Sequence, residues 1–586
     1  MSAPVLTPAE ALDEVPDDRG ARLRNWFVDQ LRSPLKPLAA ILVVAIVLLI
    51  AYPLIGVVWR TYGPGSQGFA QILSGGGDRF WEMLRNTAII VFGSGAIGMV
   101  IGIALAWVHQ RTDANLGWVG ELLPLSTLLM PLIASVVGWV ILLDPKVGYL
   151  NVLIRQLTGN TDPDATGPID IFSLPALVAI ASIYLVPYVF LMMTAAFQLL
   201  DSSLEEASRV SGASRARTFF KVLLPSVGPA LGATSVMVLI RAFSAFTVVV
   251  VIGTRNGVET LPVYIYHLIG STFPPKTGLA VLLAFVMLVV VQLLISVQSR
   301  LTRRGRNVAI GGKGGGVRRT SMRRARRPIQ VVLALYLVVT AVLPALAVLV
   351  LSFQPFWSAT IDPSQFSLKN YASMFTGGST LGTAIGNSML LAALGATVLI
   401  LVSVVIGVAQ RAASSRLRRF TSGVMAVPAL IPHTLIGVAF VIAFSPPPFS
   451  LYGTLTLVFL AYILMEMPYA SQSVQGVINS ISPELPEAAR VHGASELRAF
   501  ARVLIPLMLS SLAAGWIITF IHMTAETTAS VFLAGVNNPV VGAVMIKLTS
   551  DGTYPQVAAL AVLLTLISTA LVLIVLVLRR RSVRHL

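Results

Sequence analysis

The 586-residue chain contains no cysteine, so it can form no disulfide framework, no thiolate metal site and no cysteine nucleophile. Charged residues are also scarce, at 11% of the chain, whereas an ordinary soluble domain has roughly a quarter. Hydrophobic residues make up 55%. Because a membrane-spanning helix needs about 20 apolar residues, this composition supplies roughly a dozen spans and disfavours a water-soluble enzyme.

A phosphate-binding loop for ATP is missing as well. The Gly-Lys pair at 312–313 is followed by glycine rather than by serine or threonine, and it lies in a basic segment rather than between a strand and a helix. The sequence also shows no cluster of catalytic groups at a membrane face. We therefore expect this chain to bind no nucleotide or cofactor of its own and not to be an enzyme.

Apolar stretches of spanning length recur along the chain in two sets of six. The first set lies near 37–59, 87–108, 118–142, 174–199, 227–252 and 278–298, and the second near 329–352, 384–409, 421–444, 453–477, 508–535 and 556–578. The pattern predicts an all-α polytopic membrane protein with 12 transmembrane helices as two six-helix repeats.

The polar segments divide the chain into five parts. The predicted parts are a tail (1–36), a first transmembrane domain (37–298), a basic linker (299–328), a second transmembrane domain (329–578) and a short tail (579–586). The first tail begins with acidic residues and lacks the positive start and small-residue cleavage site of a removable signal peptide. We expect it to be a mostly disordered cytoplasmic tail.

The basic residues indicate the orientation, because Lys and Arg collect on the cytoplasmic side of a membrane. If both termini lie in the cytoplasm, 32 of the 42 Lys and Arg residues fall on that side. The densest run, 300–327, could contact nucleic acid or anionic lipid. A flexible linker that enforces the topology explains it better, so the net charge of +17 predicts a lipid bilayer and no nucleic acid as partner.

An internal repeat links the two sets of spans. Shifting the chain by 281 residues places LEEASRVSGASRARTFFKVLLP (204–225) on LPEAARVHGASELRAFARVLIP (485–506), with 13 of 22 positions identical and no gap. Each copy follows the fourth span of its set, so the two halves have the same orientation and are related by an axis along the membrane normal.

Each repeated segment is predicted to form short helices. Ser203 stands three residues before Glu206, the spacing of a capping box, and Ser482 precedes a proline at the first helical position. Gly212 and Gly493 permit a backbone bend that a Cβ would resist. A single amphipathic helix on the bilayer would explain one such segment, but two copies at a fixed offset indicate a shared function.

Both segments resemble the EAA motif of bacterial ABC importer permeases, in which a glutamate and two small residues are followed by a glycine and a proline. The departures are Ser208 for an alanine and Ile505 for a leucine. The resemblance implies a type I importer fold in the bacterial inner membrane and a coupling helix that docks on a cytoplasmic ATPase. It implies this role for Glu206, Ala207, Ser208, Arg209, Gly212, Glu487, Ala488, Ala489, Arg490 and Gly493.

The same resemblance implies the partners. Two coupling segments on one chain imply two copies of an ABC ATPase, which would bind ATP and Mg²⁺, and an extracytoplasmic binding protein that delivers the solute. An ion-coupled carrier with twelve spans is the alternative, but it leaves the two repeated loops unexplained. A membrane enzyme is the third hypothesis, and it lacks catalytic groups.

Ionisable residues inside predicted spans mark candidate positions on the substrate path, because charges in a membrane are costly. These candidates are Arg241, Glu466, His522 and Glu526. The 281-residue shift places Arg241 opposite His522, so the halves meet with unlike polar groups. An asymmetric substrate and a structural Arg–Glu pair both fit this pattern. For His433, as for Glu466, packing or interfacial hydration is the simpler interpretation.

The substrate follows from resemblance alone. Fused permeases of this length are similar to the iron(III) importer family, and the stretches ETLPVYIYHLIG (259–270) and DGTYPQVAALAVLL (551–564) resemble segments of that family. Iron(III) prefers oxygen ligands, which Glu466 or Glu526 could offer, while the site of any metal stays unknown. Importers of thiamine, 2-aminoethylphosphonate and polyamines share the architecture, and Arg241 would suit a phosphonate.

Overall fold

The computed structural model describes residues 35–62, 77–117, 119–120, 130–160, 162, 165–270, 272, 276–305, 319–411, 413–482 and 484–584. Its secondary structure is helical, and the described residues contain no β-strand beyond isolated bridges. The predicted all-α class is therefore confirmed. Almost all of the N-terminal tail, the glycine-rich part of the basic linker and the last two residues lie outside the described set.

Eight helices are long and apolar enough to cross a membrane. They are α2 (Leu35–Tyr62), α4 (Gly77–Arg111), α8 (Leu174–Gln198), α14 (Thr277–Gly305), the run of α15 (Arg326–Leu337) and α16 (Leu343–Ser352), α18 (Thr380–Arg411), α21 (Leu455–Ser480) and α27 (Tyr554–Arg584). Each coincides with one predicted span.

Three further predicted spans are bent helix pairs, which raises the number to as many as eleven among the described residues. They end in α12 (Gly228–Phe243), α20 (His433–Phe444) and α24 (Ile505–Thr524). The sharpest bend, 97°, separates 415–430 from α20, where Pro432 is the N-cap residue. The remaining predicted span, 118–142, overlaps the 12-residue α6 (Leu132–Leu143), and ten of its residues before α6 lie outside the described set.

The sequence repeat is also a repeat of helices. The segment after α8 forms α9 (Ser203–Val210), α10 (Arg215–Thr218) and a π-helix over 219–223. The segment after α21 forms α22 (Glu484–Val491), α23 (Glu496–Ala499) and a π-helix over 500–504. Each pair of elements is separated by the 281-residue offset of the sequence, so the local structure follows the repeated residues.

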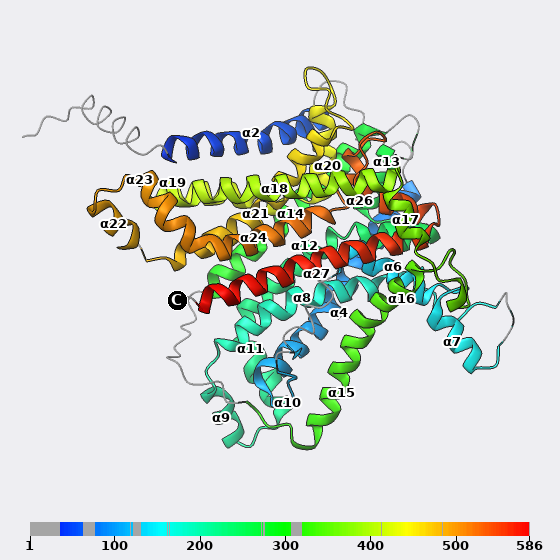
Figure 1. Cartoon of the computed structure of the whole chain (residues 1–586). Helices are drawn as coiled ribbons and strands as arrows, with labels where there is room; N and C mark the ends of the chain where they lie inside the picture. The colour runs from blue at the N-terminus through cyan, green and yellow to red at the C-terminus, as the bar shows by residue number, and fades with distance from the viewer. Residues whose placement is uncertain are drawn as a thin grey trace, which may run out of the picture.

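The first helix of each half packs on the other half. Helix α2 contacts α18 and α20, while α16 contacts α6 and α27. In Figure 1, α2 (dark blue) runs along α18, and the α15–α16 run (green) crosses towards α6. Apolar side chains of α2, α18 and α20 share one buried core, and those of α16, α6 and α27 share another. The two halves are therefore interlocked.

Close helix contact within the first half depends on small residues. A Cβ at Gly98 would lie 3.0 Å from Leu185 Cβ, and a Cβ at Gly102 would lie 2.5 Å from Val189 Cβ. Both valine and leucine belong to α8, so the glycines let α4 and α8 approach closely. These glycines therefore serve helix packing, and α8 leads directly into α9.

Candidate functional site

The first repeated segment presents α9 on the surface, immediately after α8. The side chains of Glu206, Ala207 and Arg209 are exposed, and Ser208 Oγ lies 3.0 Å from the Thr218 hydroxyl of α10. The chain then turns at Gly212, whose φ of 80° lies in the left-handed region that glycine adopts without strain. The predicted bend is therefore present, and it folds α10 back beside α9.

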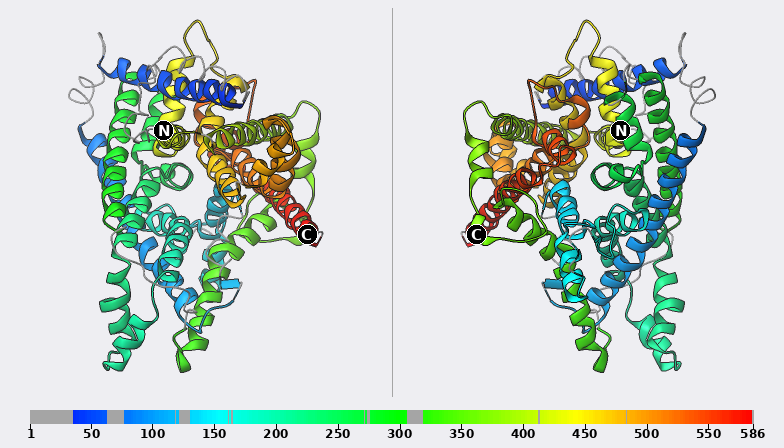
Figure 2. Two further views of the ribbon diagram at one scale, coloured as in Figure 1. Left: turned by 90° about the vertical axis from the view of Figure 1, so that its left-hand side faces the viewer. Right: turned by 90° about the vertical axis from the view of Figure 1, so that its right-hand side faces the viewer.

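The second repeated segment has the same backbone conformation, with a short helix followed by a glycine of positive φ. Helix α22 is followed by Gly493 with a φ of 84°, and Ser495 Oγ then accepts a hydrogen bond from Arg498 N at 3.3 Å. Ala488 is exposed and Ala489 is partly buried. The side chains of Glu487 and Arg490 lie outside the described part of the structure. Figure 2 shows α9–α10 (teal) and α22–α23 (orange) as two separate projections.

The predicted capping box at Ser203 is wrong. The N-cap residue of α9 is Ser202, and its side chain accepts no capping hydrogen bond. The carboxylate of Asp201 instead accepts a hydrogen bond from Ser203 N at 2.9 Å. This bond to the backbone holds the pKa of Asp201 below its usual value. In the second segment Ser482 Oγ does accept from Glu484 N, at 3.4 Å, while Pro483 lies outside the described residues.

Two arginines that contact the main chain just before the repeated segments were not identified by the sequence analysis. Arg111 is the last residue of α4, and its Nη2 donates to Leu200 O at 2.6 Å. Arg411 is the last residue of α18, and its Nη2 donates to Ile481 O at 2.8 Å. Both follow a glutamine, but residues 144–173 separate α6 from α8 while only 445–454 separate α20 from α21. Arg111 and Arg411 therefore do not align at the 281-residue offset of the repeat.

Glu205 is a third residue that the sequence analysis did not identify. Its side chain is buried in the first segment, with Oε1 3.2 Å from Arg111 Nη1, while its neighbour Glu206 is exposed. Successive residues of a helix point about 100° apart, so only one of two adjacent glutamates can face inward. The adjacent glutamates Glu205 and Glu206 were the available signal, but the sequence does not show which of the two side chains is buried.

A polar cluster joins the two halves inside the helical bundle. Arg241, near the end of α12, donates from Nη2 to the Tyr469 hydroxyl of α21 at 2.6 Å, and its guanidinium lies 4.9 Å from the Tyr188 ring centroid. In the second half, His522 Nδ1 lies 3.2 Å from Glu466 Oε2. The His522 ring also meets Tyr469 edge to face at 5.5 Å. His433 lies within electrostatic range of Arg241, Glu466 and His522.

Glu526 makes its hydrogen bonds with the main chain rather than with the side chains of this cluster. Its carboxylate accepts hydrogen bonds from the backbone N–H groups of Thr528, Ala529 and Ser530 at 2.8–3.1 Å, and its side chain is buried. The ion pairs of the described residues do not include Arg241 with Glu526. Within that same set, no group of three or more His, Asp and Glu side chains is placed to hold a metal ion.

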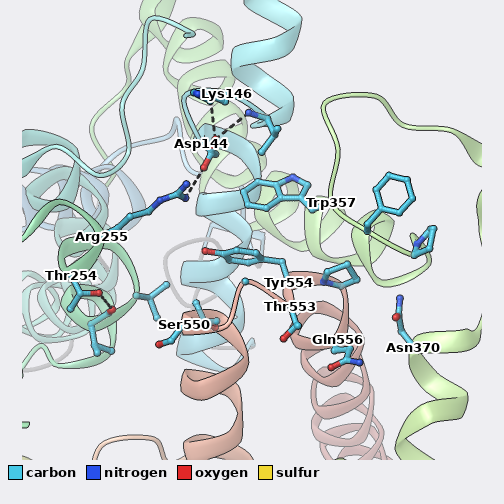
Figure 3. Close-up of a pocket in the computed structure, with 18 residues that line it drawn as sticks. Asp144, Lys146, Thr254, Arg255, Trp357, Asn370, Ser550, Thr553, Tyr554 and Gln556 are labelled. Carbon is cyan, nitrogen blue, oxygen red and sulfur yellow. Dashed lines mark hydrogen bonds and ion pairs between the residues drawn. The ribbon is translucent and has the colours of Figure 1, made fainter. Parts of the chain in front are cut away.

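A polar pocket of about 800 Å³ lies at the opposite end of the helices from α9 and α22. Figure 3 shows Asp144 and Arg255 of the first half facing Trp357 and Tyr554 of the second. Arg255 Nη1 lies 2.9 Å from Asp144 Oδ2, and the two aromatic rings meet at 4.7 Å. Both halves therefore build this pocket, which the sequence alone did not indicate.

Comparison with known proteins divides this chain into two matching parts. The family model described as "binding-protein-dependent transport system inner membrane component" matches residues 34–307 and 400–585. The chain is 30% identical over 414 residues, 67% of its length and 70% of the relative's, to a probable ABC transporter permease protein, y4fN, of Sinorhizobium fredii.

Two further relatives have named substrates. The ferric transport system permease protein FbpB of Actinobacillus pleuropneumoniae is 22% identical over 496 residues, covering 84% of this chain and 70% of the relative. The spermidine/putrescine transport system permease protein PotC of Haemophilus influenzae is 26% identical over 217 residues, covering 37% of this chain and 83% of the relative. Because the family model matches both halves, the chain belongs to the inner-membrane permease components of binding-protein-dependent ABC transport systems, with two permease units fused in one polypeptide.

Proposed function

We propose that this permease imports iron(III), delivered by an extracytoplasmic binding protein, by alternating access driven by two copies of a cytoplasmic ABC ATPase. The observation that supports the energy-coupling part is the pair α9 and α22. Each is a short surface helix that follows the fourth span of its half and is followed, two residues after its end, by a glycine with positive φ. One docking helix for each half fits one ATPase subunit for each half.

The ATPase would bind ATP and Mg²⁺, and its closing would favour one of two permease conformations over the other. In this arrangement α9, α22 and both termini lie in the cytoplasm, as the distribution of Lys and Arg predicts. The pocket around Asp144 and Tyr554 then faces the extracytoplasmic side, where the binding protein releases its solute. Exposed Glu206 and its counterpart Glu487 act at the ATPase interface.

Iron(III) is supported by the extent of similarity to a ferric permease, which covers 84% of this chain. The match to a spermidine/putrescine permease covers 37%. Glu466 and His522 offer oxygen and nitrogen atoms that a passing ferric ion can contact.

The test is to isolate the cognate binding protein, identify its ligand, and measure uptake into proteoliposomes that contain the permease and the ATPase. We expect the binding protein to carry iron(III) and ATP to drive uptake of radioactive iron. Spermidine, thiamine and 2-aminoethylphosphonate serve as competitors. Uptake of one of these compounds in place of iron would contradict the substrate, whereas uptake that needs no ATPase would contradict the importer mechanism.

A further inference from the structure

The arginines that end α4 and α18 occupy equivalent places in the two halves. Arg111 binds the carbonyl of Leu200, and Arg411 binds the carbonyl of Ile481. The 281-residue repeat places Leu200 on Ile481. Each arginine therefore ties the end of the second span to the main chain just before a coupling helix, and this contact is common to both halves.

The first half adds a buried carboxylate that the second half lacks. Glu205 of α9 is 6% exposed and pairs with Arg111, whose side chain is 0% exposed. The repeat aligns Glu205 with Pro486, which carries no charge. A buried charge is tolerated when a partner and hydrogen bonds compensate it, and removing one partner leaves the other uncompensated. The ion pair is thus a one-sided feature of the fold.

Thr320, at the end of the linker between the two halves, forms hydrogen bonds with both residues of this ion pair. The Thr320 hydroxyl donates to Glu205 Oε2 at 3.1 Å, and Thr320 N donates to Arg111 O at 2.8 Å. Asp113 N donates back to Thr320 O at 3.1 Å, and Met322 N donates to Asp113 Oδ1 at 2.7 Å. The chain that begins the second half is therefore bonded both to the end of α4 and to the first coupling helix.

We propose that Arg111, Glu205 and Thr320 form a clasp that makes α9, the end of α4 and the start of the second half move as one unit. The clasp rests on the proposed coupling role of α9, and it adds two positioning residues, Arg111 and Glu205, to that role. A movement of the first coupling helix then reaches both halves at once, through a continuous chain of bonds. The second coupling helix has the arginine contact but carries Pro486 where the first carries Glu205, so the two ATPase docking sites are unequal.

The direct test is the number of solute molecules transported for each ATP hydrolysed by the reconstituted complex. Glu205→Gln keeps the size of the side chain and an acceptor for Thr320 but removes the charge that faces Arg111. We expect this ratio to fall about fivefold or more, and Glu205→Asp to recover part of it. Glu82→Gln is the matched control, because it removes an exposed ion pair with Arg85 on the same helix. A normal ratio for Glu205→Gln in a normally assembled complex would overturn the clasp.

A second measurement does not depend on removing the charge. The chain has no cysteine, so Asn115→Cys with Gln330→Cys provides two thiols beside the clasp, where Gln330 Nε2 donates to Asn115 O at 3.4 Å. A short, cleavable thiol cross-linker should join them and leave transport intact, because the clasp stays closed. Failure to cross-link, or a loss of transport that cleavage reverses, would overturn the proposal. Loss of coupling in Glu206→Ala with Glu487→Ala tests the coupling role itself, separately from the clasp.

Discussion

Arg241 and Tyr469 belong to opposite halves of the chain, and a 2.6 Å hydrogen bond from the guanidinium to the tyrosine hydroxyl joins them. The hydrogen-bond partner of this partly buried arginine is thus an uncharged aromatic residue and not a glutamate. Tyr188 adds a ring face at 4.9 Å. Neither tyrosine neutralises the guanidinium, so Arg241 keeps its full positive charge in this contact.

Tyr469→Phe should lower solute uptake while leaving the amount of assembled complex near normal. The change removes the acceptor of a charge-assisted hydrogen bond, a loss of about 1.5–3 kcal/mol in the interaction. The measurement is uptake per complex in proteoliposomes over a range of solute concentrations. Tyr371→Phe is the control, because it removes a tyrosine hydrogen bond of 2.7 Å outside the cluster. Equal effects of the two variants would show that the Arg241–Tyr469 bond has no special role in transport.

Glu526→Gln should destabilise the protein. The carboxylate accepts from three backbone N–H groups, and a glutamine would turn an N–H donor towards one of them, at a cost of about 1.5–3 kcal/mol. The measurement is the thermal midpoint of the detergent-solubilised permease. Adding Arg241→Gln should not restore it, because the two side chains are not paired. Normal stability with lost uptake would instead place Glu526 on the substrate path.

Gly212→Ala and Gly493→Ala should impair transport through backbone strain. A Cβ at either position meets no atom within 4 Å, so the cost comes from the positive φ alone; it is roughly 1–2 kcal/mol per residue. Asparagine tolerates this conformation better, so Gly212→Asn should be milder than Gly212→Ala. Gly386→Ala is the control, because Gly386 has equal space but lies within α18 without a positive φ. Equal uptake by all four variants would contradict the prediction.

Glu206→Ala and Glu487→Ala should each lower transport, and the double variant should lower it further. Because Glu206 is exposed, its loss should change the stability by no more than about 0.5 kcal/mol. Transport-coupled ATP hydrolysis should fall about fivefold in a single variant. The assay compares ATP hydrolysis with and without loaded binding protein, at equal amounts of inserted permease. Unchanged uptake in the double variant would rule out the coupling role.

The hydrogen bond from Met322 N to the Asp113 carboxylate, at the end of the linker, should weaken in acid as Asp113 becomes protonated. The hydrogen bond from Met322 N lowers the pKa of Asp113 in the folded protein below its ordinary value of 3.8. Its contribution to stability is therefore complete above the unfolded pKa and disappears as the pH falls through the lower folded value. Asp113→Asn should remove this dependence. Thermal midpoints of both proteins between pH 3 and 7 should differ at neutral pH and converge in acid; a constant difference would argue against the contact.

Local features of the sequence were enough to predict most of the helices. Runs of apolar residues give spans because backbone groups in a bilayer must bond within their own segment. The repeat predicted two equal surface segments, and the bends at Gly212 and Gly493 followed from the absence of a Cβ. The predicted twelve spans exceed the eleven that the described residues support at most. The difference is the third apolar stretch, which overlaps the 12-residue α6 and includes residues outside the described set.

The sequence by itself determined the membrane class, the doubled organisation and the position of both repeated segments, because each depends on residues that are neighbours in the chain. Tertiary structure decided which side chains meet. It turned Glu205 rather than Glu206 inward onto Arg111, and it paired Arg241 with Tyr469 instead of a glutamate. The first contact depends on how α9 lies against the end of α4, and the second on how α12 meets α21 of the other half. Pairing between residues so far apart in the chain leaves no mark on the local sequence pattern.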